Sequence, residues 1–233
     1  MPYVKFNTAL IVGAGSGLSA SLARVLTSEG IKVALAARST ADLADLAKET
    51  GAHTIACDAT KGADVEKMFS ELDAGFGAPE IVIYNASYRT RGPLIELDPV
   101  EVEKTLAVCA FGGFLVAQQA VRRMLPKRHG AILFTGASAS VKGYAESAPF
   151  AMGKFALRGL AQSMARELHP QGIHVAHMVV DGGIRSARRP EPPGKTASLL
   201  NPNSIAASYL HMIHQPHSAW SWELELRPWV EKF

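Results

Sequence analysis

The chain has 233 residues, of which 48% are hydrophobic and 19% charged, a composition typical of a folded protein and a length that fits one α/β domain. Its formal net charge of +3 is too small to indicate a nucleic-acid-binding surface. No apolar run approaches the length of a membrane span, and the first residues lack the pattern of a secretory signal. We therefore expect a cytoplasmic protein that binds neither nucleic acid nor membrane.

In chain order, short apolar segments alternate with segments of helical periodicity. Gly30 and Gly51 follow the first two predicted helices, where glycine commonly ends a helix. Ser39 or Thr40 is the expected N-cap of the second helix. The predicted strands of this half are 6–12, 33–37, 54–57 and 80–84, and the predicted helices are 16–29, 40–49 and 64–76.

The second half of the chain continues this alternation. Segment 185–203 is the exception, because it is rich in arginine, proline and glycine and has no period, so it predicts a mobile loop. The predicted helices are 99–124, 150–169 and a short one that follows Asn201 and ends near His214, and the predicted strands are 131–135, 173–180 and a seventh within 220–233.

The alternation itself predicts the fold. Parallel strands need crossovers of at least about a dozen residues, and the predicted helices supply them. Right-handed crossovers place helices on both faces of the sheet. We therefore expect a single doubly wound Rossmann-type α/β domain over residues 1–233, with a parallel sheet of about seven strands.

A glycine-rich loop, Gly13-Ala14-Gly15-Ser16-Gly17, connects the first strand to the first helix. Backbone N–H groups and a helix N-terminus at such a place can bind a pyrophosphate, and glycines allow its close approach. The spacing differs from the G-x-G-x-x-G form, because Leu18 stands where its third glycine would be.

This G-x-x-x-G spacing instead resembles the short-chain dehydrogenase/reductase (SDR) family, and the resemblance runs from residue 5 to about 187. Asn85-Ala86-Ser87 is similar to the family's Asn-Ala-Gly motif, and Asp181 to Ser186 is similar to the segment that holds the nicotinamide end. Ser19 stands at the family's third glycine. The resemblance implies that a cofactor is bound by Gly13, Gly15, Ser16, Gly17, Leu18, Arg38, Asp58, Ala59, Asn85, Ala86, Ser87, Lys154, Gly182 and Ile184.

The end of the second strand bears on which nicotinamide cofactor is used. An acidic residue there would bond the ribose 2′-OH and repel a 2′-phosphate, but the chain has Ala37. Arg38 follows, and a guanidinium can hold a phosphate with paired hydrogen bonds. We predict NADP(H) over NAD(H); the alternative is that Arg38 only solvates the strand end.

The catalytic residues implied by the resemblance are an asparagine, a serine, a tyrosine and a lysine. Lys154 falls at the lysine position. Phe150 stands at the tyrosine position, Ala137 at the serine position and Cys109 at the asparagine position. Phenylalanine has no titratable proton, so it cannot act as the acid that the tyrosine provides.

Three interpretations remain open. The protein is an oxidoreductase that transfers hydride to a small carbonyl substrate with an atypical catalytic set of Lys154, Ser138 and Tyr144, where Ser140 or a water held by Lys154 are other possible donors. Alternatively it is a non-catalytic NADP(H)-binding module, a sensor or partner subunit. In the third interpretation it reduces an activated C=C or C=N bond, which needs less help from an acid.

Other features concern partners. Arg185, Arg188, Arg189 and Lys195 in the segment that covers the substrate in this family favour an anionic substrate or contact with cofactor phosphates. The resemblance implies a homodimer or homotetramer formed through helices near 104–124 and 150–169. We expect no metal site, because His211, His214 and His217 have no supporting carboxylate or cysteine.

Overall fold

A computed structural model describes residues 5–231 and contains one seven-stranded parallel sheet in the order β3-β2-β1-β4-β5-β6-β7. The predicted doubly wound Rossmann-type domain is therefore confirmed. The order reverses between β1 and β4, which is where such sheets open a crevice for a ligand. The strands are β1 (Thr8–Val12), β2 (Lys32–Ala37), β3 (His53–Ala56), β4 (Ile81–Tyr84), β5 (Gly130–Thr135), β6 (Ile173–Val180) and β7 (Glu223–Leu226).

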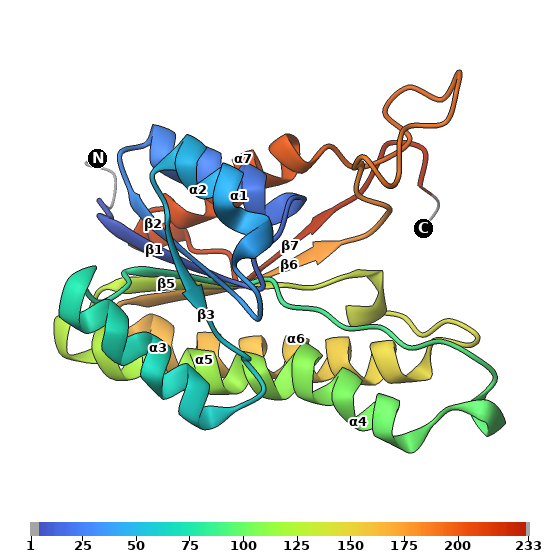
Figure 1. Ribbon diagram of the computed structural model, residues 1–233, viewed down its shortest axis with the longest axis horizontal. Coiled ribbons are helices and arrows are strands. Elements are labelled where there is room, and N and C mark those ends of the chain that lie inside the picture. Colours follow the sequence, from blue (N-terminus) through green and yellow to red (C-terminus); the bar gives the residue numbers. More distant parts are fainter. Residues whose placement is uncertain (1–4, 232–233) are drawn as a thin grey trace.

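Helices cover both faces of the sheet (Figure 1). One layer consists of α1 (Leu18–Ser28), α2 (Ala44–Thr50) and α7 (Pro202–Ile213). The other layer consists of α3 (Gly62–Gly75), α4 (Pro99–Leu106), α5 (Gly112–Met124) and α6 (Ala148–Leu168). None of the described helices is long and apolar enough to cross a membrane.

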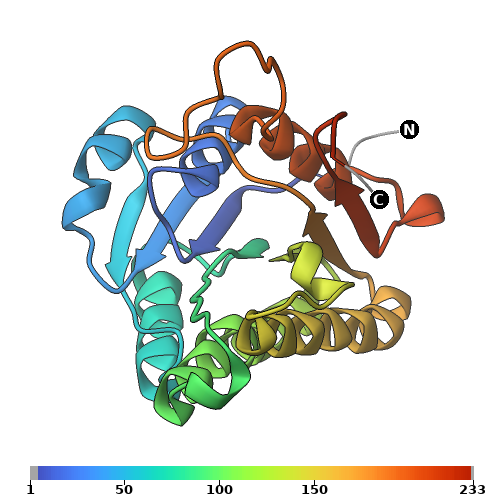
Figure 2. The same ribbon diagram turned by 90° about the vertical axis from the view of Figure 1, so that its right-hand side faces the viewer.

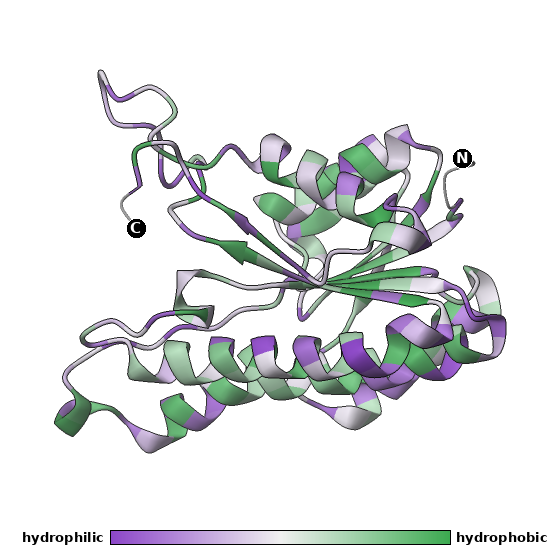
Figure 3. Ribbon diagram, turned by 180° about the vertical axis from the view of Figure 1, so that it is seen from behind, coloured by the Kyte–Doolittle hydropathy of each residue, from purple (hydrophilic) through white to green (hydrophobic). Residues whose placement is uncertain are grey.

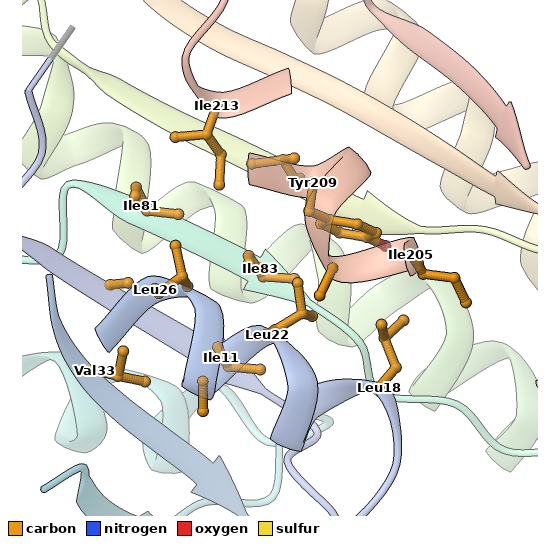
Figure 4. Close-up of a cluster of buried hydrophobic side chains, with 14 of the residues drawn as sticks. Ile11, Leu18, Leu22, Leu26, Val33, Ile81, Ile83, Ile205, Tyr209 and Ile213 are labelled. Atoms are coloured by element: carbon orange, nitrogen blue, oxygen red, sulfur yellow. The ribbon is translucent and has the colours of Figure 1, made fainter. Parts of the chain in front are cut away.

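The strands are mostly hydrophobic because both of their faces are buried (Figure 3). Successive side chains of β1 point to opposite faces, so Ile11 packs with α1 and α7, while Leu10 packs with the helices of the other layer. Figure 4 shows the first of these cores, in which Leu22 of α1 and Tyr209 of α7 lie over Ile11 and Ile83. These two cores hold the carboxyl ends of the strands at one edge of the molecule.

Three local predictions differ from the structure. The predicted helix 99–124 is interrupted by a π-helical turn, Ala107–Phe111, whose extra residue directs Cys109 inward and leaves Phe111 exposed. The second helix begins with a 3₁₀ turn, and Thr40 makes no side-chain capping bond, although Gly51 ends the helix with φ +67° as expected. The last strand ends at Leu226, and residues 232–233 of the predicted segment lie outside the described residues.

Candidate functional site

A pocket of about 620 Å³ opens at the carboxyl ends of β1 to β4. Many predicted cofactor residues line it: Gly13, Arg38, Asp58, Ala59, Asn85, Ala86 and Ser87. Gly15, Ser16, Gly17 and Leu18 continue the same loop into α1. Ala14 of the predicted loop and Ala37 at the end of the second strand also line the pocket. The lining residues that no sequence motif indicated are Val12, Ser39, Asp42, Cys57, Thr60, Tyr88 and Val108.

The glycine loop is bent back against the end of β4. Gly13 has φ +82°, and a Cβ there would lie 2.3 Å from the backbone nitrogen of Ala86, so only glycine fits. The N–H groups of Gly13 and Ala14 both donate to the Ala36 carbonyl, at 2.9 and 3.0 Å. Gly15 and Gly17 instead face open space, with no atom within 4 Å of an added Cβ. The loop therefore offers an uncovered stretch of backbone beside the pocket.

Ser19 joins this loop to β4. Its hydroxyl donates to the Gly13 carbonyl at 3.2 Å and accepts from the Asn85 side-chain amide at 2.8 Å. Ser19 is buried, so the two bonds are shielded from water. The serine at the place of the family's third glycine is therefore part of the site's framework, which its position in the sequence alone does not reveal.

Charged groups occupy the β2 and β3 side of the pocket. Asp58 accepts hydrogen bonds from the backbone and hydroxyl of Thr60, at 3.1 and 2.8 Å. Burial acts to raise the pKa of Asp58, but the Thr60 bonds and the nearby charges of Lys61 and Arg38 outweigh it and leave the pKa below its usual value. Asp42 also lines the pocket, so a ligand there would meet a negatively charged carboxylate as well as the positive charge of Arg38.

Lys154 of α6 is buried beside the end of β5. Its Nζ donates to the Thr135 carbonyl at 2.8 Å, and the Thr135 hydroxyl shares a hydrogen bond of 2.8 Å with Tyr209. Burial is the main cause that lowers the pKa of Lys154. Its Nζ lies 5.7 Å from the centroid of the Phe150 ring, one helical turn away.

Next to Lys154 lies a small apolar cluster, formed by Cys109, Ala139 and Phe150 with Ala137 packed against them. Cys109 is fully buried and its Sγ donates to the Tyr88 carbonyl at 3.2 Å. The cluster brings together residues from the π-helical turn, from the segment after β5 and from α6. Residues from three distant parts of the sequence are thus packed against one another.

Ser138 and Tyr144 lie outside this cluster. Ser138 is half-buried in the 3₁₀ turn Ser138–Ser140, and the Tyr144 side chain is 46% exposed on the following loop. The pKa of Lys142 is raised chiefly by its bond to Asp181, with a smaller contribution from Tyr144, so the phenol lies near that lysine. The structure brings Lys154 and Phe150 together and leaves Tyr144 at the surface.

The predicted nicotinamide segment follows β6. Gly182 has φ +148°, and a Cβ there would lie 2.7 Å from Cδ of Pro228. Ile184 forms a parallel bridge with Leu200, so segment 185–203 leaves and rejoins the domain at one point. Figure 2 shows this segment, in orange, projecting from the body of the domain. Within residues 5–231, no cluster of three or more histidine, cysteine or acidic side chains could hold a metal ion.

A family model described as short chain dehydrogenase matches residues 7–191. The chain belongs to the short-chain dehydrogenase family. This is a family of oxidoreductases that bind nicotinamide cofactors, and the chain is an SDR oxidoreductase by that membership.

Relatives of this SDR chain come from bacteria and plants. It is 29% identical over 178 residues to the 3-oxoacyl-[acyl-carrier-protein] reductase MabA of Mycobacterium avium, which covers 76% of this chain and 67% of that protein. It is 30% identical over 180 residues to short chain aldehyde dehydrogenase 1 of Euphorbia lathyris, which covers 72% of this chain but only 61% of that protein.

Solved structures of SDR proteins share the fold over nearly the whole chain. A short-chain dehydrogenase from Rhodopseudomonas palustris is 32% identical, with a TM-score of 0.82 over 96% of this chain and 99% of that one. A metagenomic short-chain oxidoreductase solved in complex with NADP is 24% identical, with a TM-score of 0.84 over 97% of this chain and 98% of that one. At that identity the second likeness concerns the fold alone.

Proposed function

We propose that this SDR protein binds NADP(H) and transfers hydride between the cofactor and a small carbonyl or related substrate, with an altered catalytic set. The observation that carries the proposal is the pocket beside the glycine loop, in which Gly13 contacts the Ala86 backbone while Gly15 and Gly17 leave space. The residues present fit a dinucleotide, since exposed backbone N–H groups at the start of α1 suit a pyrophosphate. A bound nicotinamide would supply or accept the hydride.

The protein's own residues then have separate roles. Asp58, kept ionised by its Thr60 bonds, accepts hydrogen bonds from an adenine. Asn85, Ala86 and Ser87 line the pocket toward the nicotinamide end, and Gly182 and Ile184 follow β6 on its other side. Arg38 lines the pocket, and because a guanidinium can hold a phosphate with paired hydrogen bonds, it supports the proposal of NADP(H).

We further propose that Phe150, Ala137 and Cys109 stand at the family's tyrosine, serine and asparagine positions. Their contact in one cluster supports this assignment, because residues of one catalytic unit must lie together. The side-chain nitrogen of Lys154 lies next to them and donates a hydrogen bond to the Thr135 carbonyl. The substrate oxygen then takes its proton from solvent or from a neighbouring hydroxyl, and Ser138 and Tyr144 are the candidates on this chain.

Substitution of the surrogate donor is a direct test of that role. If Tyr144 is the acid, Tyr144→Phe abolishes turnover and leaves NADPH binding intact, whereas Ser138→Ala serves as the matched variant for the other candidate. Full activity in both variants would leave solvent as the proton source and remove both residues from the catalytic set.

A non-catalytic NADP(H)-binding module is the second candidate, and the apolar cluster favours it because three neighbouring positions offer no hydroxyl or amide to a substrate. Oxidation of NADPH with a panel of carbonyls, imines and enones separates the two. An enzyme consumes NADPH with at least one of them and loses this activity in Lys154→Ala. A binding module consumes none, and Lys154→Ala changes only its affinity for NADPH.

We propose that the protein forms a homodimer or homotetramer through α4, α5 and α6. Exposed aromatic side chains support this, because Phe114 of α5 is 41% and Phe155 of α6 45% exposed, and Phe111 of the π-helical turn between α4 and α5 is 52% exposed. Val116 and Leu157 of these helices are buried within the chain and are not available for such a contact. Segment 185–203 is proposed to cover a substrate, and its basic residues other than Arg185, which pairs with Glu191, favour an anionic one.

A further inference from the structure

Two arginine side chains from separate loops lie over the proposed catalytic region. The guanidinium carbon of Arg89 lies over the face of the Phe150 ring, 4.3 Å from its centroid. Nη1 and Cδ of Arg189 lie 2.8 and 3.3 Å from the place that a Cβ on Gly183 would occupy, so this side chain covers the segment that follows β6. Arg89 was not singled out by any sequence motif.

Backbone contacts fix both loops. The N–H of Gly92 donates to the Glu146 carbonyl at 3.1 Å, which ties the loop of Arg89 to the loop that leads into α6 and Phe150. Arg189 and Ser186 exchange two backbone hydrogen bonds, both of 3.0 Å, in a tight turn. These main-chain bonds fix the two loops, and the Phe150 ring is the side chain on which the Arg89 guanidinium rests.

Other basic residues near these two arginines form ion pairs with carboxylates. Lys142 lies 3.1 Å and Arg227 3.2 Å from the buried carboxylate of Asp181, and Arg185 lies 3.8 Å from Glu191. Within residues 5–231, no ion pair joins Arg89, Arg91 or Arg189 to a carboxylate.

These unpaired arginines lie within electrostatic range of one another. Burial lowers the pKa of Arg89, and the charges of Arg91 and Arg189 lower it further. Arg89 and Arg189 are both exposed, so an incoming anion can reach them, and it would relieve the repulsion between their like charges.

We propose that Arg89 and Arg189 bind an oxyanion group of the substrate, a carboxylate or a phosphate, between the Phe150 ring and the segment at Gly183. This inference rests on the proposed function, because it places the substrate next to the predicted nicotinamide segment. A guanidinium fork matches the oxygens of either anion with two hydrogen bonds. Phe150 acquires a role in this arrangement, since its ring supports the Arg89 guanidinium by a cation–π contact.

The test uses binding, not turnover. The protein is saturated with NADP⁺, which cannot donate a hydride, and isothermal titration calorimetry measures three probes: acetoacetate, its uncharged ethyl ester, and dihydroxyacetone phosphate. The wild type is compared with Arg89→Gln and Arg189→Gln. Arg185→Gln is the matched control, because this arginine lies in the same segment but pairs with Glu191.

The inference predicts that acetoacetate, dihydroxyacetone phosphate or both bind at least about tenfold more tightly than the ester, because hydrogen bonds to a charged group are the stronger kind. Preference for one probe identifies the group as carboxylate or phosphate. Arg89→Gln and Arg189→Gln each weaken the charged probe about tenfold, and Arg185→Gln changes its affinity less than about twofold.

Equal affinity for the ester and the charged probes overturns the inference, and so does the absence of binding by all three. An effect of Arg89→Gln and Arg189→Gln on NADPH affinity, with no effect on the probes, also overturns it, since the arginines would then serve the cofactor phosphates. The proposed function fails separately, when the wild type binds neither NADPH nor NADH in a titration without any probe.

Discussion

Two neighbouring parts of one sheet edge differ sharply in character. Beside β1 to β4, the pocket is held by polar contacts, such as those that join Ser19 to Gly13 and to Asn85. Beside β5 and α6, the contacts among Cys109 and Phe150 are apolar, with the Lys154 amine next to them and the Arg89 guanidinium over the Phe150 ring. The first part provides the backbone geometry that suits a dinucleotide, whereas the cluster in the second part offers no hydroxyl to a substrate.

The composition of the apolar cluster is consistent with the cost of burying polar groups without hydrogen-bond partners. Removal of one member of a buried polar network leaves its partners without hydrogen bonds, at a cost of about 1–3 kcal/mol for each group. Joint replacement by apolar groups avoids that cost. Cys109 retains a bond to the Tyr88 carbonyl, and Lys154 retains one to the Thr135 carbonyl, so both polar atoms that remain are satisfied.

The largest expected effect is a loss of stability at acidic pH that originates from two buried histidines of β6. Burial is the main cause that lowers the pKa of His174 and of His177 to about 4 from 6.5. Unfolded chains take up these protons below about pH 6.5 and the native protein does not until about pH 4, so the free energy of unfolding falls as the pH falls through this window. Two such groups predict a loss on the order of 5 kcal/mol.

Urea unfolding at pH 7.5, 6 and 5 measures this dependence. In His177→Met the slope of the free energy of unfolding against pH becomes shallower, because one of the two groups is removed. Stability that is constant from pH 7.5 to 5 in the wild type would show that neither histidine is held neutral by its surroundings.

The second prediction addresses the cofactor part. In Gly13→Ala, a methyl group meets the Ala86 backbone at a residue with φ +82°, and we expect a loss of roughly 3 kcal/mol in the free energy of unfolding together with loss of NADPH binding. Gly15→Ala is the matched control, since its Cβ would face open space. This control keeps wild-type stability in urea, while its NADPH affinity falls if the cofactor approaches the loop backbone. Unchanged stability of Gly13→Ala would contradict the described contact.

A smaller effect concerns the choice between the two nicotinamide cofactors. Arg38→Ala lowers the affinity for NADPH about tenfold and leaves that for NADH nearly unchanged, because it removes the proposed phosphate contact. Asp42→Asn raises the affinity for NADPH, since it removes a negative charge that lines the same pocket. Fluorescence titration of both variants with both cofactors checks the pair. Equal losses for NADPH and NADH in Arg38→Ala would assign Arg38 to a general solvating role.

Much of the fold could be predicted from the sequence, because strands buried on both faces appear as continuous apolar runs. Helix ends such as Gly51 were also predictable, because they depend only on the local backbone conformation. The π-helical turn at 107–111 could not be predicted, since the apolar pattern of 99–124 is that of one continuous helix and Cys109 contacts residues distant in the sequence. The glycine loop was predictable because its backbone conformation dictates its residues. The stacking of Arg89 on Phe150 joins two irregular loops, and no periodicity encodes such a contact.

We propose that the cofactor part binds NADP(H) although the neighbouring catalytic part is apolar. A fluorescence titration with NADPH, and in parallel with NADH, of the wild type and of Phe150→Tyr tests it most directly. We predict that both proteins bind NADPH with the same affinity, at least about tenfold more tightly than NADH. Binding of neither cofactor by the wild type, or NADPH binding that appears only in Phe150→Tyr, would contradict it.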